Sequence, residues 1–539
     1  MRAWTRWAAP LAVLAVLAVL ALAALLRFWA LGRPGTLVFD EIYYVRDAIS
    51  QLAHGFPTVW PDDDPSMAGA RATAFGAEAS NAVHPPLGKW LIGLGILVFG
   101  PESGWGWRSA AALSGVATVG IVMRLGWLMS RSMVVACTAG LLLAVDGVHV
   151  VLSRVGLLDG FLATAIALGA LFVWRDQLAL AARAERCAPD RPLPVWWGRP
   201  WLLAAAAAFG AAAAIKWSGL YPLACFLILV TVRDLLARLR RRDPRAVLRA
   251  VGQAAASAAL ALPTAALVYL ASWAGWIIAP GGWAREAGVP WPVSLLAYHR
   301  EMLGWHSTLS APHPYQSHPL SWPLALRPTA MYEQRSGIEC AAADCVAAVS
   351  PLPNPLVTWG GVIALGVLVW LIVRALRGAS GPAARHAVPG GGSGAGAAPG
   401  FGGGIATALP LPFATAAAFV VTGYLSGWLP WVATVSRSAV FQFYAVVLTP
   451  FSALALALVL GVLCRVGALG RAAELPGGPG AQGLGLRPLD AAELLGRRGA
   501  AAVFLALAVA LGVFFFPLWS GMPVPEGFWR AHLWLPGWD

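Results

Sequence analysis

The chain has 539 residues, 59% of them hydrophobic, and a mean hydropathy of +0.68. This composition excludes an ordinary soluble globular protein, because many stretches stay apolar for about 20 residues, the length that crosses a bilayer. The formal net charge of +13 could suggest nucleic acid as a partner, but the arginines gather in loops between apolar runs, as in residues 238–245. Such clustering is typical of the loops that set membrane topology, so we expect no nucleic-acid partner.

The first predicted span runs from Ala9 to Trp29, and Arg2 and Arg6 before it place the N-terminus in the cytoplasm. No small-residue cleavage site follows, so we expect an uncleaved anchor rather than a signal peptide. The further predicted spans are Trp107–Leu128, Met133–Val151, Gly156–Trp174, Trp201–Ile215, Gly219–Val232, Val251–Trp276, Leu356–Val373, Pro410–Leu429, Val440–Cys464 and Ala500–Leu518. With every basic loop on one side, the prediction is an all-α polytopic membrane protein of about eleven transmembrane helices with an external C-terminus.

One apolar run, Pro86 to Gly100, is too short to cross a bilayer in the usual way. If it were a crossing, every later basic loop would lie outside, against the positive-inside rule. We therefore expect a re-entrant or interfacial helix on the external face.

This topology divides the chain into nine segments. In order, we expect the first span (1–30), an external loop with the interfacial helix (31–106), a transmembrane bundle (107–275), a long external loop (276–355), a span (356–377), a flexible cytoplasmic linker (378–408), further spans (409–464), a cytoplasmic loop (465–499), and the last span with an external tail (500–539). The 276–355 loop is long enough that a functional role is expected.

The acidic pair Asp40-Glu41 follows the first span and is flanked by apolar residues. Carboxylates at a bilayer edge are costly unless they are paired or used. One could act as a general base on a membrane-delivered substrate. The alternative is a helix N-terminal cap or a solvated loop charge.

Further polar candidates fall on the predicted external face: His84, Lys89, Arg108, Asp159, Lys216 and Arg437. Lys89 and Lys216 are the chain's two lysines. Cations beside carboxylates suit a phosphate ester carried on a lipid, with cations binding the phosphate and a carboxylate taking a proton from an acceptor hydroxyl. Plainer roles stay open, since His84 can close a turn, Asp159 can cap a helix, and Arg437 can extend to the membrane interface.

The long external loop contains several histidines and a pair of cysteines. His299, His306, His313 and His318 match no zinc-ligand spacing, so we expect no metal site. Cys340 and Cys345 lie close together, and a local disulfide would form there in an oxidising compartment.

Seven segments resemble, in order, the protein O-mannosyltransferases (glycosyltransferase family 39), most closely the actinobacterial type: FDEIYYV, HPPLGKW, WRSAAALSG, LLDG, KWSGLY, HSTLSAPHPYQSHPLSWPLALRP and LPWVATVSRSAVFQFY. The resemblance covers nearly the whole chain. It implies a GT-C-class glycosyltransferase that transfers mannose, with inversion, from polyprenyl-phosphate mannose to Ser or Thr of exported proteins. It further implies a multi-pass protein of the bacterial plasma membrane with an external active site, acceptors met at the Sec translocon, and no cofactor or divalent metal.

The resemblance also implies roles for individual residues. Asp40 looks like the general base that deprotonates the acceptor hydroxyl, and Glu41 would orient the acceptor or the sugar. Arg108 matches an arginine associated with the donor phosphate. The remaining expected contacts are Lys89, Lys216, His84, Asp159 and Arg437 to the donor phosphate or sugar, Tyr315 and Tyr332 to the acceptor, and a Cys340–Cys345 disulfide.

Two competing functions stay open at this point. One is a polyprenyl-phosphate-sugar transferase of the same architecture that modifies a lipid or a glycan. The other is a transporter or channel, which would place polar residues near the bilayer midplane or show broken helices in matching halves.

Overall fold

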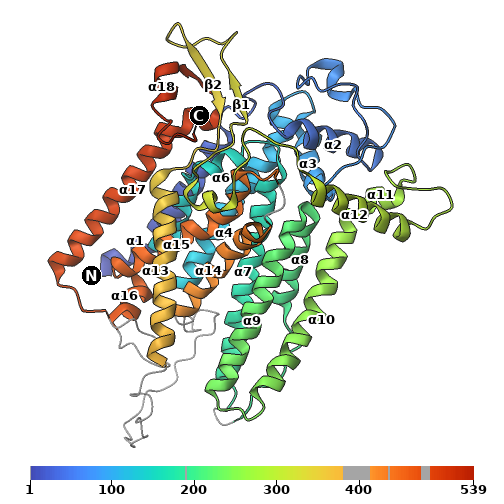
Figure 1. Ribbon diagram of the computed structural model, residues 1–539. Coiled ribbons are helices and arrows are strands. Elements are labelled where there is room, and N and C mark those ends of the chain that lie inside the picture. Colours follow the sequence, from blue (N-terminus) through green and yellow to red (C-terminus); the bar gives the residue numbers. More distant parts are fainter. Residues whose placement is uncertain (1, 189–190, 380–412, 435–437, 475–485, 539) are drawn as a thin grey trace, which may run out of the picture.

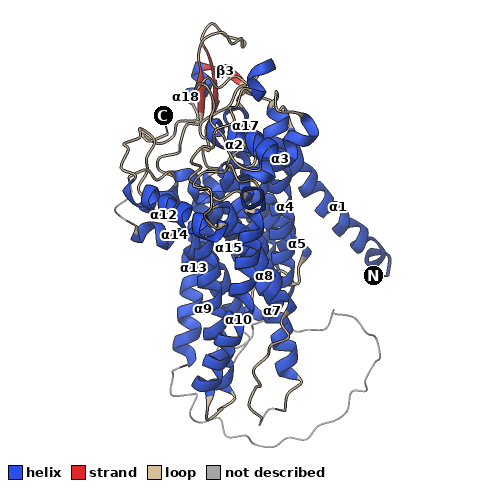
Figure 2. Ribbon diagram, turned by 90° about the vertical axis from the view of Figure 1, so that its right-hand side faces the viewer, coloured by secondary structure: helices blue, strands red, loops and turns tan. Residues whose placement is uncertain are grey.

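The computed structural model describes residues 2–188, 191–379, 413–434, 438–474 and 486–538. Long helices run side by side as a bundle, and short helices, loops and a small sheet cover one end of it (Figure 1). We call this the loop end, and the opposite end, with the arginine-rich connections, the basic end. Figure 2, which shows the molecule from the side, separates the same two ends.

Within the described residues, nine helices are long and apolar enough to cross a membrane. They are α1 (Arg2–Phe28), α4 (Gly104–Ser130), α7 (Leu158–Glu185), α9 (Leu220–Arg240) with the 3₁₀ turn η2 (Trp217–Gly219), α10 (Ala246–Ser272), α13 (Pro355–Ala379), α14 (Phe413–Ala433), α15 (Thr449–Leu463) with the 3₁₀ turn η6 (Gln442–Leu448), and α17 (Ala491–Ser520). The all-α membrane fold is therefore confirmed.

Three shorter apolar helices accompany them: α3 (Leu87–Phe99), α5 (Met133–Ala144) and α8 (Pro200–Ile215). The expected span Trp201–Ile215 coincides with α8, and α5 forms the first part of the expected span Met133–Val151. The 13 residues of α3 extend about 20 Å at 1.5 Å per residue, less than the ~30 Å hydrocarbon core. A helix is thus present where an interfacial or re-entrant segment is expected, and its depth stays a prediction.

The expectation of one continuous helix over Met133–Val151 is wrong. The first helix ends at Ala144, and α6 (Gly147–Leu152) begins after a break. Asp146 caps the new helix, since its carboxylate accepts a hydrogen bond of 2.8 Å from the backbone N–H of His149. An N-terminal cap of this kind satisfies an amide that the preceding helix cannot.

The loop end is built from the segments between the long helices. Its short helices are α2 (Glu41–His54), η1 (Gly69–Thr73), α11 (Ala274–Ile278), α12 (Trp291–Thr308), η3 (Pro319–Leu324) and α18 (Glu526–Arg530). The described part of the basic end includes one short helix, α16 (Gly467–Glu474). The expected linker 378–408 falls outside the described residues beyond the end of α13.

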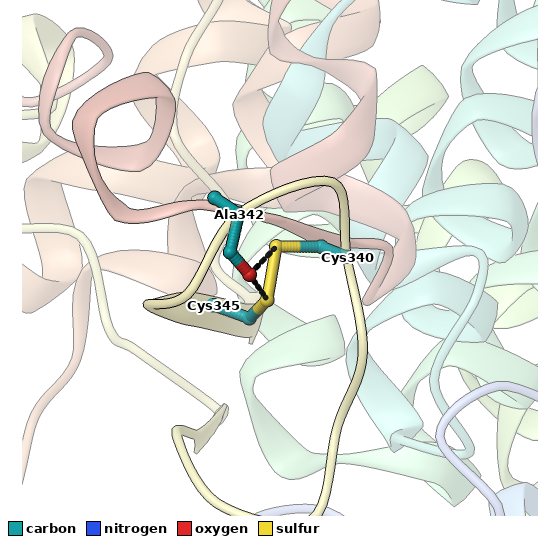
Figure 3. Close-up of a disulfide and its surroundings, with 3 residues drawn as sticks. All are labelled: Cys340, Ala342 and Cys345. Carbon is teal, nitrogen blue, oxygen red and sulfur yellow. Dashed lines mark hydrogen bonds between the residues drawn. A yellow bond between two sulfur atoms is a disulfide. The ribbon is translucent and has the colours of Figure 1, made fainter.

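A three-stranded antiparallel sheet joins the long loop to the C-terminal segment. The strands lie in the order β1 (Tyr332–Gln334), β2 (Cys345–Val349) and β3 (Pro523–Pro525). The expected disulfide between Cys340 and Cys345 is present, with Cα atoms 5.9 Å apart, and it closes the connection between β1 and β2 (Figure 3).

Close backbone approach at the end of α8 brings the next segment into position for the site. At Gly219 an added Cβ would lie 2.4 Å from the carbonyl carbon of Ala212, so a larger residue cannot fit. The chain leaves α8 at Lys216, whose backbone is extended, and turns through η2 back against α8. This turn holds the Lys216 side chain at the loop end.

Candidate active site

Asp40 stands immediately before α2 and makes no side-chain capping bond with that helix. The N-terminal-cap alternative therefore does not account for it. Its carboxyl group is half-buried and lines a cavity of about 540 Å³, which we call the aspartate cavity. The pKa of Asp40 is raised to about 6, mainly by burial. The charge of Lys216 and a hydrogen bond with Tyr44 lower this pKa, and the charge of Asp159 raises it. A carboxyl group with this pKa is well matched to taking a proton near neutral pH.

The neighbouring Glu41 is in a different environment, because it is fully buried and paired with Arg108. The guanidinium donates from Nε to Oε1 at 2.8 Å and from a terminal nitrogen to Oε2 at 2.7 Å. The backbone N–H groups of Val38 and Gly156 donate to the same carboxylate at 2.9 and 2.6 Å. Four donors thus hold Glu41 within the protein.

Arg108 is also fully buried, and its remaining hydrogen bonds go to the loop between α1 and α2. It donates to the carbonyl oxygens of Leu31, Pro34 and Thr36 at 3.4, 2.8 and 3.0 Å. Neither Arg108 nor Glu41 lines the cavities at this site. The expected contacts of Arg108 with phosphate and of Glu41 with acceptor or sugar stay predictions, and the geometry shows both residues holding the loop and the start of α2.

Lys216 and Asp159 form the second charged pair of the site. Lys216 Nζ lies 2.7 Å from Asp159 Oδ2, and both side chains are almost completely buried. The ammonium group also lies 4.7 Å from the centre of the Tyr444 ring. Asp159 is in the first turn of α7, but the helix has no side-chain cap, so its contact is with the lysine.

Lys216 and Asp159 line a second cavity of about 250 Å³, which we call the lysine cavity. His84 and Tyr444 line both cavities, so the two spaces adjoin at these side chains. Lys216 is close enough to influence the charge on Asp40 from across this junction. The carboxyl group of Asp40 in one cavity and the Lys216–Asp159 pair in the other therefore lie on either side of His84 and Tyr444.

Lys89 supports the segment that carries His84. Its Nζ donates to the carbonyl oxygen of His84 at 2.9 Å and lies 3.4 Å from Asp47 Oδ2. Lys89 also lines the aspartate cavity, although it is almost fully buried. Lys89 is thus part of the cavity wall with its charge paired to Asp47, and its expected contact with the donor phosphate or sugar stays a prediction.

Helix α12, from the long loop 276–355, covers the same segment. The Tyr298 hydroxyl donates to the carbonyl oxygen of Ala82 and accepts from the Ala82 N–H, both at 3.0 Å. About two turns further along α12, His306 Nε2 hydrogen-bonds the Val83 carbonyl oxygen at 2.8 Å, and its ring lies 5.1 Å from that of His84. The long loop therefore forms part of the site wall.

The other candidates are placed differently. Tyr315 and Tyr332 line neither cavity; Tyr332 lies in β1 and donates its hydroxyl to Gln334. Arg437 lies outside the described residues. Among the described residues, no group of three or more His, Cys, Asp or Glu side chains could hold a metal ion.

Sequence reasoning gave no site role to Tyr44 or Tyr444, and it considered His306 only as a metal ligand. Tyr44 and Tyr444 are the last residues of the FDEIYY and SAVFQFY runs, which lie within segments that carry the family resemblance. Their importance depends on contacts between distant segments, and a tyrosine near a membrane interface is by itself an ordinary finding.

These features define a polytopic membrane enzyme with a charged site at one end of its bundle. Two family models match the chain: "Dolichyl-phosphate-mannose-protein mannosyltransferase" over residues 17–270, and "C-terminal four TMM region of protein-O-mannosyltransferase" over residues 293–538. The chain belongs to the protein O-mannosyltransferase family.

Similar proteins agree with this assignment. The chain is 31% identical over 542 residues to the polyprenol-phosphate-mannose--protein mannosyltransferase of Mycobacterium tuberculosis (strain ATCC 25618 / H37Rv), covering 95% of this chain and 88% of that protein. It is 32% identical over 544 residues to the protein of the same name from Mycolicibacterium smegmatis (strain MKD8), covering 95% and 90%. The fold is similar to the S. cerevisiae Pmt1-Pmt2 complex bound to the sugar donor, with a TM-score of 0.68, 14% identity, and coverage of 98% and 92%.

Proposed function

We propose that the chain transfers mannose from polyprenyl-phosphate mannose to Ser or Thr hydroxyls of exported proteins, with Asp40 as the general base. The observation that carries this is the position of Asp40, which is half-buried, lines the aspartate cavity and has a pKa of about 6. Lys216 lines the lysine cavity, which shares His84 and Tyr444 with the aspartate cavity. The mycobacterial relatives are named for this donor and for protein as acceptor.

The two cavities suit the two substrates. The lysine cavity would take the mannosyl phosphate, because Lys216 supplies the compact cation that a phosphate leaving group needs. The aspartate cavity, with Asp40 in its wall, would take the acceptor segment. His84 and Tyr444 would then lie beside the reacting atoms.

The reaction follows from this arrangement as a single displacement. The acceptor oxygen bonds to C1 of mannose while the bond from C1 to the phosphate oxygen breaks, and the hydroxyl proton passes to Asp40. The phosphate leaves with its electron pair and charge, beside Lys216. Attack from the face opposite the phosphate inverts the configuration at C1. No cofactor or metal is required in this scheme.

The external side of a bacterial plasma membrane is the proposed location of the site. Arginine-rich connections follow α7, α9 and α15 at the basic end, and arginine-rich loops remain in the cytoplasm. The loop end would therefore face outward, where the Sec translocon would deliver unfolded acceptors.

A membrane assay with radiolabelled polyprenyl-phosphate mannose and a Ser/Thr-rich peptide tests the proposal, comparing the natural chain with Asp40→Asn. Removal of a general base typically reduces the rate about 10²–10⁴-fold. Label in the peptide that is lost in the variant supports both reaction and base. Label that persists in the peptide with the variant would show that a residue other than Asp40 is the base. Label found only in lipid or glycan would support a transferase that modifies those acceptors instead of protein.

A further inference from the structure

The last long helix, α17, packs against the bundle along only part of its length. Its buried residues all lie at or after Ala508, and none of the residues 491–507 is buried. Figure 1 shows α17 in red along the edge of the molecule, with its first half toward the basic end. A cavity of about 490 Å³ remains between this half, α5 and α15.

The walls of this cavity are mostly aliphatic. The apolar lining residues come from three helices: Val134 and Val135 of α5, Leu460 and Gly461 of α15, and Ala502 and Leu505 of α17. Both α15 and α17 are long, apolar helices that can cross a membrane. A space of this kind facing the bilayer is filled by hydrocarbon, because apolar walls favour contact with acyl chains over water.

The polar rim of the cavity is basic. Arg498 lines it and donates from Nε to the carbonyl oxygen of Cys464 at 3.3 Å. Within the described part of the chain, the two terminal nitrogens of Arg498 and the whole guanidinium of Arg497 have no hydrogen-bond or ion-pair partner. Nearby, Arg465 donates to the carbonyl oxygen of Arg487 at 3.1 Å.

Within the described residues, no carboxylate forms an ion pair with Arg497 or Arg498. Glu493 pairs with Arg487, and its partner in the capping box, Asp490, accepts the N–H of Glu493 at 2.8 Å. Arg498 lines the apolar cavity, and Arg497 precedes it in α17. Guanidinium groups match phosphate geometry particularly well.

We propose that this cavity binds one anionic phospholipid, with an acyl chain between α5, α15 and α17 and its phosphate on Arg497 and Arg498. The site is separate from the proposed catalytic centre. Tyr444, which lines the catalytic cavities, lies in η6, and α15 follows η6 directly. The 15 residues of α15 extend about 22 Å from η6 to Cys464, which lines the lipid cavity. The proposal therefore does not depend on the proposed function.

The test measures lipid binding by the full-length protein in mild detergent. Native mass spectrometry should find about one phosphatidylglycerol per natural chain and a higher unfolding temperature with phosphatidylglycerol than with phosphatidylcholine. Arg497→Gln with Arg498→Gln should weaken phosphatidylglycerol binding about 30-fold, because each arginine near a lipid surface contributes about 1 kcal/mol. The matched control, Arg240→Gln with Arg245→Gln, removes two exposed arginines, the last residue of α9 and the residue before α10, and should bind normally.

A second variant tests the chamber without changing charge. Ala502→Trp puts an indole in the cavity and should also prevent retention of phosphatidylglycerol. Equal loss in both arginine pairs would overturn the site, since it would indicate general attraction to a basic surface. An equal thermal shift from inorganic phosphate alone would overturn the lipid as ligand, and undiminished binding in Ala502→Trp would overturn the placement of the acyl chain.

Discussion

Glu41 and Arg108 are 67 positions apart in the chain, yet they form a bidentate ion pair in which both side chains are fully buried. The same guanidinium donates to three carbonyl oxygens of the loop between α1 and α2. Because Glu41 directly follows Asp40, this pair fixes the start of α2 and so the position of the proposed base. We infer that Arg108 acts through Glu41 on the placement of Asp40.

Arg108→Met tests this inference, because it leaves the Glu41 carboxylate buried without its cation. Removing one partner of a buried pair costs about 3–5 kcal/mol. We expect a lower unfolding temperature and a lower kcat, with little change in the KM for the lipid-linked donor. Purified protein in detergent allows both measurements.

A matched control is available at the basic end. Arg199 and Asp176 form another buried bidentate pair, at 3.1 and 2.6 Å. Arg199→Met should cause a comparable loss of stability while the folded fraction keeps its kcat. A large rise in donor KM for Arg108→Met at normal stability would instead support direct contact between Arg108 and the donor phosphate.

Much of the fold could be predicted because long apolar segments with arginine-rich connections have few structural solutions in a membrane. The break at Asp146 could not, since one aspartate within an apolar run does not show whether it caps a helix or pairs elsewhere. Only the structure shows its bond to the His149 N–H. Length and hydropathy therefore indicate where a helix exists better than where it stops.

For the site, the sequence identifies the chemistry-bearing residues better than it distinguishes their roles. Asp40 and Glu41 are adjacent, but one lines a cavity and the other is enclosed by four donors. The difference arises from Arg108 and Gly156, which lie far away in the chain. Lys216 was notable because lysine is rare here, and its pairing with Asp159 required the packing of α7 against α8.

The pKa of Asp40 leads to a prediction about pH. A general base works only when ionised, so with a pKa of about 6 activity should rise with pH through that value and then level off. At pH 5 about a tenth of the carboxyl groups are ionised, and kcat/KM should be about tenfold below the plateau. The measurement is transfer to peptide from pH 4.5 to 8, with protein integrity checked at each pH. A flat profile across this range would remove Asp40 as the titrating base.

Substitutions of Lys216 and Asp159 should shift the midpoint of that pH profile in opposite directions. The positive charge of Lys216 lowers the pKa of Asp40, and the negative charge of Asp159 raises it. Lys216→Met should therefore move the midpoint to higher pH, and Asp159→Asn should move it to lower pH. The plateau should also fall about 10²–10³-fold in Lys216→Met, if the ammonium stabilises the leaving phosphate as an oxyanion donor does. Midpoints that move together in the two variants would contradict the electrostatic account.

Tyr298 on α12 provides a test of whether the long loop 276–355 shapes the site. Tyr298→Phe removes one hydroxyl that bonds both the N–H and the carbonyl oxygen of Ala82, two residues before His84. Leaving buried polar groups unpaired costs about 1–3 kcal/mol, so the segment carrying His84 should become less well held. We expect kcat/KM for the acceptor peptide to fall about tenfold, which corresponds to about 1.4 kcal/mol.

Tyr424→Phe is the matched control for this substitution. Tyr424 is also buried, but it lies in α14, and within the described residues its hydroxyl has no hydrogen-bond partner. The control should keep the natural kcat/KM, and both variants should retain monodisperse elution in detergent. An equal fall in the two variants would show that loss of any buried tyrosine hydroxyl impairs the enzyme. Normal activity in Tyr298→Phe would show that α12 covers the His84 segment without positioning it. Any effect of the long loop on catalysis would then have to come from another contact, such as the bond between His306 and the Val83 carbonyl oxygen.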